Sequence, residues 1–373
     1  MKMLHISDLH LGKKVCDFPM LDLQDNILRQ ILAAVDSESP DCVIIAGDIY
    51  DKSSPPTQAV TMFDNFLTDL VSRNVHIFII SGNHDSPERL SFGAHIMEAC
   101  NVHISGAYNG IISPVTLTDH LGEVDFYMLP FLRPSTVRPF FKDIEIKSYN
   151  DAVNTAIDAM HADFSRRCVI ISHQFVTGAV TSDSEELTVG GLENVDAAAY
   201  DGFDYAALGH IHKPQNVGSV NIRYSGTPLK YSFSEANQQK SVTIAELGEK
   251  GDLKVSEIPL VPKLDMREIK GCFEDIYSGE GSNDLVHITL TDEQDISDAI
   301  RKLRKVYPNV LRLDYDNKRT QMNTGLAALE VKEGKTPAEL FSEFYFQRNN
   351  AHMSEVQLEF VKELINNIWE EQS

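Results

Sequence analysis

Residues 77–85 read IFIISGNHD, a short apolar run that ends directly in residues able to bind a divalent metal. Four other apolar runs end in the same way: MLHI at 3–6 before Asp8 and His10, CVII at 42–45 before Asp48, CVII at 168–171 before His173, and YAAL at 205–208 before His210 and His212. Short runs of this composition are typical of buried parallel strands, and ligands gather at the carboxyl ends of such strands. We therefore predict an α/β fold in which five strands bring these side chains to one edge of one sheet.

The bulk composition is that of an ordinary globular protein, with 42% hydrophobic residues in 373. The first 25 residues contain no signal-peptide core, and no window offers the ~18 consecutive apolar residues of a membrane span. Five scattered cysteines do not suggest a disulfide framework. These features together predict a cytoplasmic, reducing location.

The net charge of −22 argues against tight nucleic-acid binding by the chain alone. It does not exclude nucleic-acid chemistry. If DNA or RNA is the substrate, its affinity must come from bound metals, local basic clusters or a partner protein.

Alternating strand-like and helix-like segments predict a layered α/β domain that becomes β-rich near its end. The expected helices cover 21–35, 57–71 and 151–164. We divide the chain into an α/β domain (1–262), a small α+β cap (263–316), a linker (317–335) and a two-helix tail (336–373).

The tail helices carry apolar residues that must be buried somewhere. Ser354 and Gln357 have the spacing of a capping box for the second helix. Docking on a partner is favoured over docking on the chain's own domain, because so many aromatic residues lie beyond a linker. The candidate partner-binding residues are Phe341, Phe344, Tyr345, Phe360, Leu364 and Trp369.

The residues after the five strands suit a pair of divalent ions such as Mn²⁺ or Fe²⁺, which accept mixed oxygen and imidazole ligands. Asp48 follows a strand of its own and is the expected bridge between the ions, while Asn83 offers a neutral oxygen. His210 and His212 stand two apart, so they point the same way in extended chain. Taken singly, Asp8 or Asp48 also suits a helix N-cap and His173 a buried structural histidine; the whole set in this order favours metal binding.

His84 directly follows Asn83 and is expected to point away from the metals. Its imidazole would contact the scissile phosphate or protonate the leaving oxygen, with Asp85 orienting it. The alternative is a histidine that only braces the turn.

The motifs Asp-x-His, Gly-Asp, Gly-Asn-His-Asp, His and Gly-His-x-His resemble the calcineurin-like metallophosphoesterase superfamily. Longer stretches are similar to the SbcD family of nuclease subunits: LHISDLHLGK (4–13), GNHDSPERLSFG (82–93), DYAALGHIHKPQ (204–215) and RYSGTPLKYSFSE (223–235). The resemblance implies a sandwich of two β-sheets flanked by helices, with a capping domain and a partner-binding tail. It assigns one Mn²⁺ to Asp8, His10, Asp48 and His212, the other to Asp48, Asn83, His173 and His210, and the catalytic role to His84.

The same resemblance implies hydroxide attack on DNA phosphodiesters between two metals, as an exonuclease on duplex ends and an endonuclease on single strands or hairpins. The expected setting is DNA repair, recombination and replication, in a heterotetramer of a nuclease homodimer with an SbcC-type coiled-coil ATPase. Some relatives carry a histidine where this chain has Asp51, so the resemblance assigns no second catalytic histidine, and Asp51 is either a phosphate-proximal or a structural group. The alternative is a phosphatase or small-molecule phosphodiesterase of the same superfamily.

Overall fold

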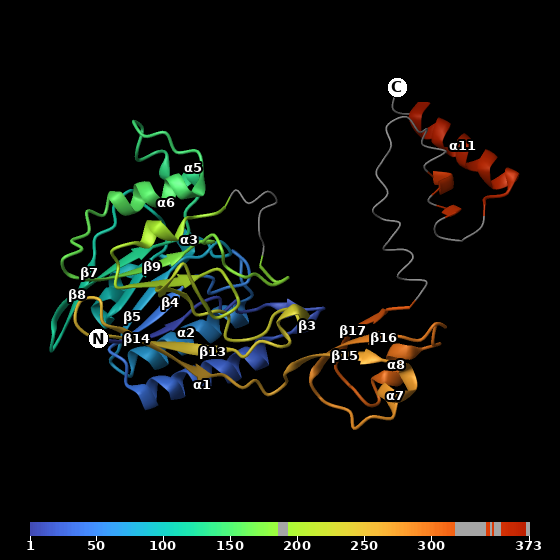
Figure 1. Cartoon of the computed structure of the whole chain (residues 1–373), viewed down its shortest axis with the longest axis horizontal. Helices are drawn as coiled ribbons and strands as arrows, with labels where there is room; N and C mark the ends of the chain where they lie inside the picture. Colours follow the sequence, from blue (N-terminus) through green and yellow to red (C-terminus); the bar gives the residue numbers. More distant parts are fainter. Residues whose placement is uncertain (186–192, 318–340, 344, 347–351, 371–373) are drawn as a thin grey trace. The chain divides into compact units, whose positions relative to one another are not determined.

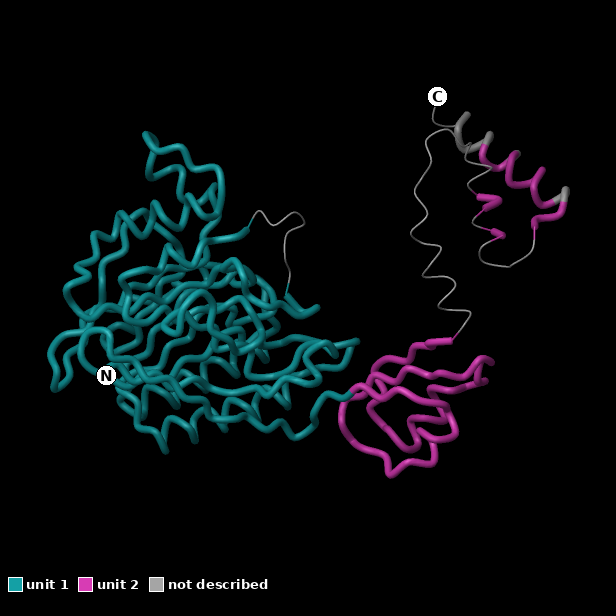
Figure 2. The backbone as a smooth tube through the Cα atoms, in the orientation of Figure 1, with its two compact units in different colours: residues 1–267 teal, residues 268–373 magenta. Residues whose placement is uncertain are grey.

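The computed structural model describes residues 1–185, 193–317, 341–343, 345–346 and 352–370. The chain forms two compact units, residues 1–267 and 268–373 (Figure 2). The division lies close to the boundary expected after residue 262. The expected linker, 317–335, falls outside the described residues apart from Asn317.

The first unit contains two six-stranded sheets. In the first, the order is β14-β13-β1-β4-β5-β6, with β1, β4, β5 and β6 parallel to one another and the β13–β14 pair antiparallel at one side. Its strands are β1 (Lys2–Ile6), β4 (Cys42–Ala46), β5 (His76–Ile80), β6 (Val102–Ser105), β13 (Ser241–Leu247) and β14 (Leu253–Pro259).

The second sheet has the order β11-β12-β10-β9-β8-β7, again with four parallel strands (β12, β10, β9 and β8) and antiparallel strands at both edges. Its strands are β7 (Val115–Asp119), β8 (Gly122–Leu129), β9 (Arg167–His173), β10 (Tyr205–Gly209), β11 (Gln215–Val217) and β12 (Ser219–Tyr224).

The expectation that all five strands followed by candidate metal ligands share one sheet is therefore wrong. β1, β4 and β5 belong to the first sheet, whereas β9 and β10 belong to the second. Apolar runs report that both faces of a strand are buried, but they carry no information on which strands pair. The two-sheet sandwich implied by the family resemblance is the correct architecture.

Alternate residues of β9 face two different cores. Ile44 of β4 and Val169 of β9 belong to a core between the sheets. Cys168 and Ile170 of β9 face outward and pack with Ala152 and other residues of helix α6 (Tyr149–Asp158). Helices α1 (Leu21–Glu38) and α2 (Thr57–Val71) lie on the opposite side of the sandwich from α6 (Figure 1).

The helix predictions differ in how well their ends agree with the structure. α2 covers the expected 57–71, and α1 continues past the expected end until Ser39 adopts a left-handed conformation (φ 47°). α6 begins at the capping box of Ser148 and Asp151 but ends well before the expected residue 164. His161, also left-handed (φ 49°), turns the chain toward β9.

Short elements complete the unit. They are β2 (Lys14–Val15), β3 (Phe18–Pro19), α3 (Pro87–Leu90), α4 (Ala94–Met97), α5 (Pro134–Val137) and the 3₁₀ turns η1 (Glu98–Cys100), η2 (Ala197–Tyr200) and η3 (Phe233–Glu235).

Residues 266–315 form a three-stranded sheet and two short helices, an α+β arrangement with its own apolar core. The elements are β15 (Met266–Gly271), α7 (Phe273–Tyr277), β16 (Leu285–Leu290), α8 (Ala299–Leu303) and β17 (Val310–Tyr315).

Helix α11 (Glu355–Glu370) forms most of the described part of the tail. Residues 341–343 and 345–346 are also helical. Ser354 and Gln357 exchange reciprocal side-chain-to-backbone hydrogen bonds of 2.9 and 3.3 Å at the start of α11. Of the candidate partner-binding residues, Phe341, Phe360 and Leu364 are exposed, and the hydroxyl of Tyr345 accepts a hydrogen bond from Gln357. Phe344 and the side chain of Trp369 lie outside the described part.

In the described ranges, no helix combines the length and apolar character needed to cross a membrane. All five cysteines are free thiols.

Candidate metal centre

The carboxyl ends of β1, β4 and β5 meet those of β9 and β10 at one edge of the sandwich. Ligand-type atoms gather there into three overlapping groups, within each of which all atoms lie within 4.8 Å of one another. The groups are Asp8–His10–His212, His10–Asp48–His84 and Asp8–Asp48–His173. These are the groups found in the part of the chain that the structure describes.

Asp48 lies at the middle of this arrangement. Its Oδ2 is 3.3 Å from Nε2 of His173, 3.8 Å from Nε2 of His10 and 4.0 Å from Nε2 of His84. One carboxylate therefore reaches side chains of both sheets, which is the position required of a ligand that bridges two ions.

The remaining candidates lie on either side of Asp48. Oδ1 of Asn83 is 3.1 Å from Nε2 of His173 and 3.0 Å from Nδ1 of His210. On the other side, the Nε2 atoms of His10 and His212 face each other at 3.2 Å. The structure thus brings together all seven side chains that the sequence suggested as ligands, and it adds His84 at their border.

The protonation preferences of the buried groups suit metal binding. Burial lowers the pKa of His10 well below its ordinary value, and burial with the neighbouring His173 lowers the pKa of His210 to about 3. Burial opposes ionisation of Asp48, but the facing His173 outweighs it and holds the carboxyl pKa well below its usual range. Neutral imidazoles and ionised carboxylates are the donors that divalent transition metals take. His10 and His210 are held neutral, whereas Asp48 outweighs burial and raises the pKa of His173 to about 9, so a bound metal would displace the His173 proton. With that proton released, the donor set fits such ions.

The backbone at the ligands is strained. Asp8, His10, Asp48 and His210 have φ values of 53°, 44°, 50° and 100°, in the left-handed region that non-glycine residues rarely adopt. Backbone hydrogen bonds of 3.0 Å from Asp8 to Gly47 and from His10 to Asp48 join the loops after β1 and β4. Such conformations cost about 1–3 kcal/mol each and cluster at functional sites.

Gly209 shows why the two sheets can meet at this edge. A Cβ atom at this position would collide with the backbone oxygen of Ala46, across the gap between β10 and β4. Only glycine permits this approach, which brings His210 beside Asp8: the backbone N–H of His210 donates to Oδ1 of Asp8 at 3.0 Å.

His173 and His84 are each oriented by a backbone carbonyl. Nδ1 of His173 donates to the oxygen of Ala46 at 2.7 Å, so its Nε2 is left to face Asp48 and Asn83. Nδ1 of His84 donates to the oxygen of Asp51 at 2.8 Å, so its Nε2 also faces inward.

The expectation that Asp85 orients His84 is wrong. The Asp85 carboxylate accepts hydrogen bonds from the backbone N–H groups of Ile49, Tyr50 and Gly82, at 3.0–3.2 Å. Asp85 therefore ties the loop after β5 to the loop after β4. The sequence suggested Asp85 as the partner of His84 because the two are neighbours in the chain. The actual partner is the backbone oxygen of Asp51, in the loop after β4.

Sequence reasoning also missed the residues around His212. Ser184 Oγ lies 2.6 Å from Nδ1 of His212 and donates to Glu235, which in turn binds Lys240. Glu235 ends the stretch RYSGTPLKYSFSE, whose similarity to known nucleases was the available signal.

Comparison with known proteins identifies the framework around this centre. A family model described as calcineurin-like phosphoesterase matches residues 1–214. The chain belongs to that family. A second model, for an SbcD C-terminal region and described as type 5 capsule protein repressor C-terminal domain, matches residues 262–349 of this phosphoesterase.

Two relatives extend the comparison. The SbcD subunit of the nuclease SbcCD from Staphylococcus epidermidis is 34% identical over 373 residues, which cover 98% of this chain and 98% of that protein. This phosphoesterase is thus a homologue of SbcD nucleases along nearly its whole sequence. A dimetal phosphatase from Danio rerio, known from its crystal structure, is 12% identical with a TM-score of 0.42, covering 70% of this chain and 96% of that one.

Proposed function

We propose that this phosphoesterase is the nuclease subunit of an SbcCD-type complex and hydrolyses phosphodiester bonds in DNA. The observation that carries the proposal is the 34% identity to a nuclease subunit over 98% of both chains. The buried donors at the shared edge of the two sheets support it, because they suit a two-ion hydrolase.

The proposed ligands are Asp8, His10, Asp48 and His212 for one ion and Asp48, Asn83, His173 and His210 for the other. Mn²⁺ is the proposed ion, since mixed imidazole and oxygen donors suit it better than Ca²⁺. When bound, two such ions would activate a water molecule and neutralise charge on the phosphate. Asp48, which lies within 4 Å of His10 and His173, would hold the two positions at a fixed separation.

His84 is the proposed catalytic residue. Its Nδ1 is held by the oxygen of Asp51, so Nε2 is directed toward the space beside Asp48 from a partly exposed position. From there it can donate a hydrogen bond to the scissile phosphate or a proton to the leaving oxygen.

Arg133 is a proposed contact for the DNA backbone. Its guanidinium lies over the ring of Phe131, 5.5 Å from the ring centre, and the Phe131 ring lies 6.2 Å from His173 and 6.4 Å from His210. An exposed cation beside the ligands would attract a neighbouring phosphate despite the net charge of −22.

The rest of the chain is proposed to serve assembly. Residues 263–316 would cap the nuclease domain, and the tail 336–373 would bind the coiled coil of an SbcC-type ATPase. The exposed Phe341, Phe360 and Leu364 support this role. Exposed apolar side chains often mark a protein-binding surface, because a partner that covers them removes apolar surface from water. We further propose a homodimer of nuclease domains within a heterotetramer.

The test is cleavage of single-stranded and hairpin DNA by the purified chain in Mn²⁺, in Mg²⁺ and in chelator, beside hydrolysis of p-nitrophenyl phosphate. Mn²⁺-dependent DNA cleavage with little phosphomonoesterase activity is expected. Strong phosphomonoesterase activity with intact DNA would instead identify a phosphatase. Deletion of 336–373 is expected to keep DNA cleavage and to remove ATPase binding; retained binding would contradict the role of the tail.

A further inference from the structure

His212 is held both at its backbone and at one of its ring nitrogens. Its backbone N–H donates to Oε1 of Glu185 at 2.8 Å, and its carbonyl accepts hydrogen bonds from Nζ of Lys240 at 2.8 Å and from the backbone N–H of Thr227 at 3.1 Å. Its Nδ1 lies 2.6 Å from Oγ of Ser184. Only Nε2 is left, and it faces Nε2 of His10.

The direction of the Ser184 bond follows from its second partner. Oγ of Ser184 lies 2.5 Å from Oε1 of Glu235, whose carboxylate accepts hydrogen bonds. A serine hydroxyl has one proton, so when that proton goes to Glu235 its oxygen must accept the proton of His212 Nδ1. This order leaves the lone pair of His212 on Nε2, where a metal would bind.

Glu235 is itself fixed in a buried ion pair. Its side chain is 0% exposed and that of Lys240 is 3% exposed, with Nζ of Lys240 2.5 Å from Oε2 of Glu235. Glu235 also accepts from the backbone N–H of Tyr231 at 3.2 Å. Burying such a pair brings little net stability, so its placement behind a metal ligand points to a role in the site.

His173, at the end of β9, is oriented in a different way. His173 donates to a backbone carbonyl, that of Ala46, which no substitution of a side chain removes. His212 depends on side chains from two segments distant in sequence, 182–185 and 227–240. Its orientation can therefore be changed without altering a strand.

We propose that Glu235 is a positioning residue that acts through Ser184 to fix the tautomer and orientation of His212, and that this sets the affinity for the ion shared by His212, His10 and Asp8. The proposal rests on the two-ion centre proposed above. Residues that orient metal-binding histidines typically change metal affinity by about 10–100-fold when they are removed.

The test compares Ser184→Ala with Ser184→Thr, which keeps the hydroxyl, and with Ser234→Ala. Ser234 accepts a hydrogen bond from the backbone of Asp183 at 3.0 Å and so holds the same loop without contacting His212. Two quantities are measured: Mn²⁺ affinity by calorimetric titration, and the tautomer of His212 by ¹⁵N NMR of the metal-free protein.

In Ser184→Ala we expect one of two Mn²⁺ affinities to fall by about tenfold or more, the other to stay unchanged, and His212 to lose its preference for a protonated Nδ1. Ser184→Thr and Ser234→Ala should match the unmodified protein. An unchanged tautomer and unchanged affinities in Ser184→Ala would overturn the proposal, as would an equal loss in Ser234→Ala, which would indicate loop anchoring alone. If the unmodified protein binds no Mn²⁺, the proposed two-ion function fails instead.

Discussion

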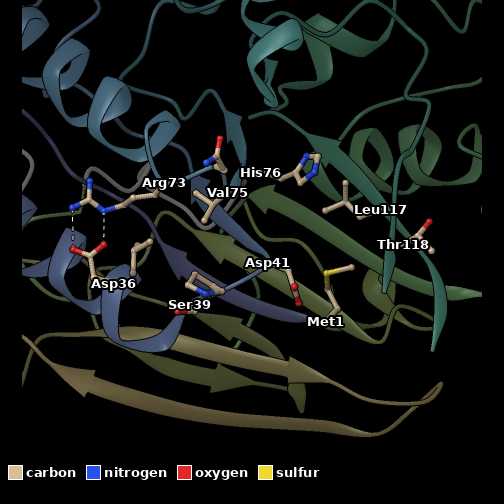
Figure 3. Close-up of a pocket in the computed structure, with 12 residues that line it drawn as sticks. Met1, Asp36, Ser39, Asp41, Arg73, Val75, His76, Leu117 and Thr118 are labelled. Carbon is tan, nitrogen blue, oxygen red and sulfur yellow. Dashed lines mark hydrogen bonds and ion pairs between the residues drawn. The ribbon is translucent and has the colours of Figure 1, made fainter. Parts of the chain in front are cut away.

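The two edges of the sandwich contain the same residue types but use them differently. At the amino edge of the first sheet, a pocket of about 480 Å³ is lined by Asp36, Asp41, Arg73 and His76 (Figure 3). Arg73 forms two hydrogen bonds to Asp36, at 2.7 and 3.0 Å. Asp41 accepts from the backbone of Lys2 at 2.6 Å, and His76 stacks on His103.

At the carboxyl edge, the described residues include no lysine or arginine paired with Asp8 or Asp48. Their partners are imidazoles and backbone N–H groups. A carboxylate whose charge is already matched by arginine has little to offer a cation, whereas one that faces imidazoles, which give up their protons to a metal, attracts it. The contrast teaches that aspartate and histidine can form a metal site where no lysine or arginine pairs with the carboxylates.

The two edges should differ most in how substitutions there affect kcat. His84→Gln at the carboxyl edge is expected to lower kcat for DNA cleavage by about 10²–10⁴-fold, because it removes the group placed to transfer a proton or stabilise charge. Metal binding should remain near normal, as measured by Mn²⁺ titration. His76→Gln at the opposite edge is the matched control and should keep full activity. Loss of Mn²⁺ binding in His84→Gln would reassign His84 to the structure of the site.

The amino edge should matter for stability. Asp119 accepts from Arg167 at 2.6 and 3.0 Å and from the amino terminus at 2.6 Å, and these contacts hold the pKa of its carboxyl well below the usual range. Its stabilising effect is therefore present above the unfolded pKa of about 4 and is lost as the pH falls through the lower folded value.

Asp119→Asn is expected to cost about 3 kcal/mol at pH 7, because it leaves Arg167 without its buried partner. The difference from the unmodified protein should shrink at acidic pH. Urea unfolding at several pH values checks this, and an equal difference at every pH would contradict it. Mn²⁺ binding by Asp119→Asn should be unchanged, because the amino edge supports stability and the candidate metal ligands lie at the carboxyl edge.

Metal should stabilise the protein through the carboxyl edge alone. At a concentration 100 times its dissociation constant, a bound ion adds about 2.7 kcal/mol, which for a domain of this size raises Tm by roughly 5–10 °C. Asp48→Asn should abolish this rise, whereas Asp41→Asn should retain it. Thermal unfolding with Mn²⁺ and with chelator measures both, and a Tm independent of Mn²⁺ would remove the basis of the comparison.

The smallest effect is expected at Arg73. Its pair with Asp36 is exposed to solvent, and exposed ion pairs contribute little. Arg73→Ala should leave DNA cleavage unchanged and shift Tm close to the limit of detection. A large loss of activity would mean that the pocket in Figure 3 takes part in function.

Patterns local in sequence predicted much of this molecule. The helix-like pattern of 57–71 predicted α2 to its ends, and the apolar runs located the strands that carry the metal-binding candidates. The seven candidate ligands could be named because each follows a strand directly, so its position depends on a few neighbouring residues.

Contacts between residues distant in sequence could not be predicted. Periodicity shows that β9 is buried on both faces, but not that it pairs in a different sheet from β4. Nothing near Ser184 predicts that it would contact His212, since the contact depends on how loops from separate strands pack. The prediction for Asp85 failed for the same reason. Its carboxylate binds the backbone of the loop after β4, and His84 instead donates to the backbone oxygen of Asp51.

The pairing of β1 with β13 has a consequence for how the protein is made. Leu4 lies opposite Ile244, so during synthesis β1 keeps one edge unpaired until about 240 further residues have followed. At 5–20 residues per second, this interval is roughly 10–50 s. Lys240, which holds the carbonyl of His212, emerges at the same stage. A nascent chain therefore carries every candidate ligand before it has the framework to hold them, and the nuclease domain becomes complete only near the end of its own translation.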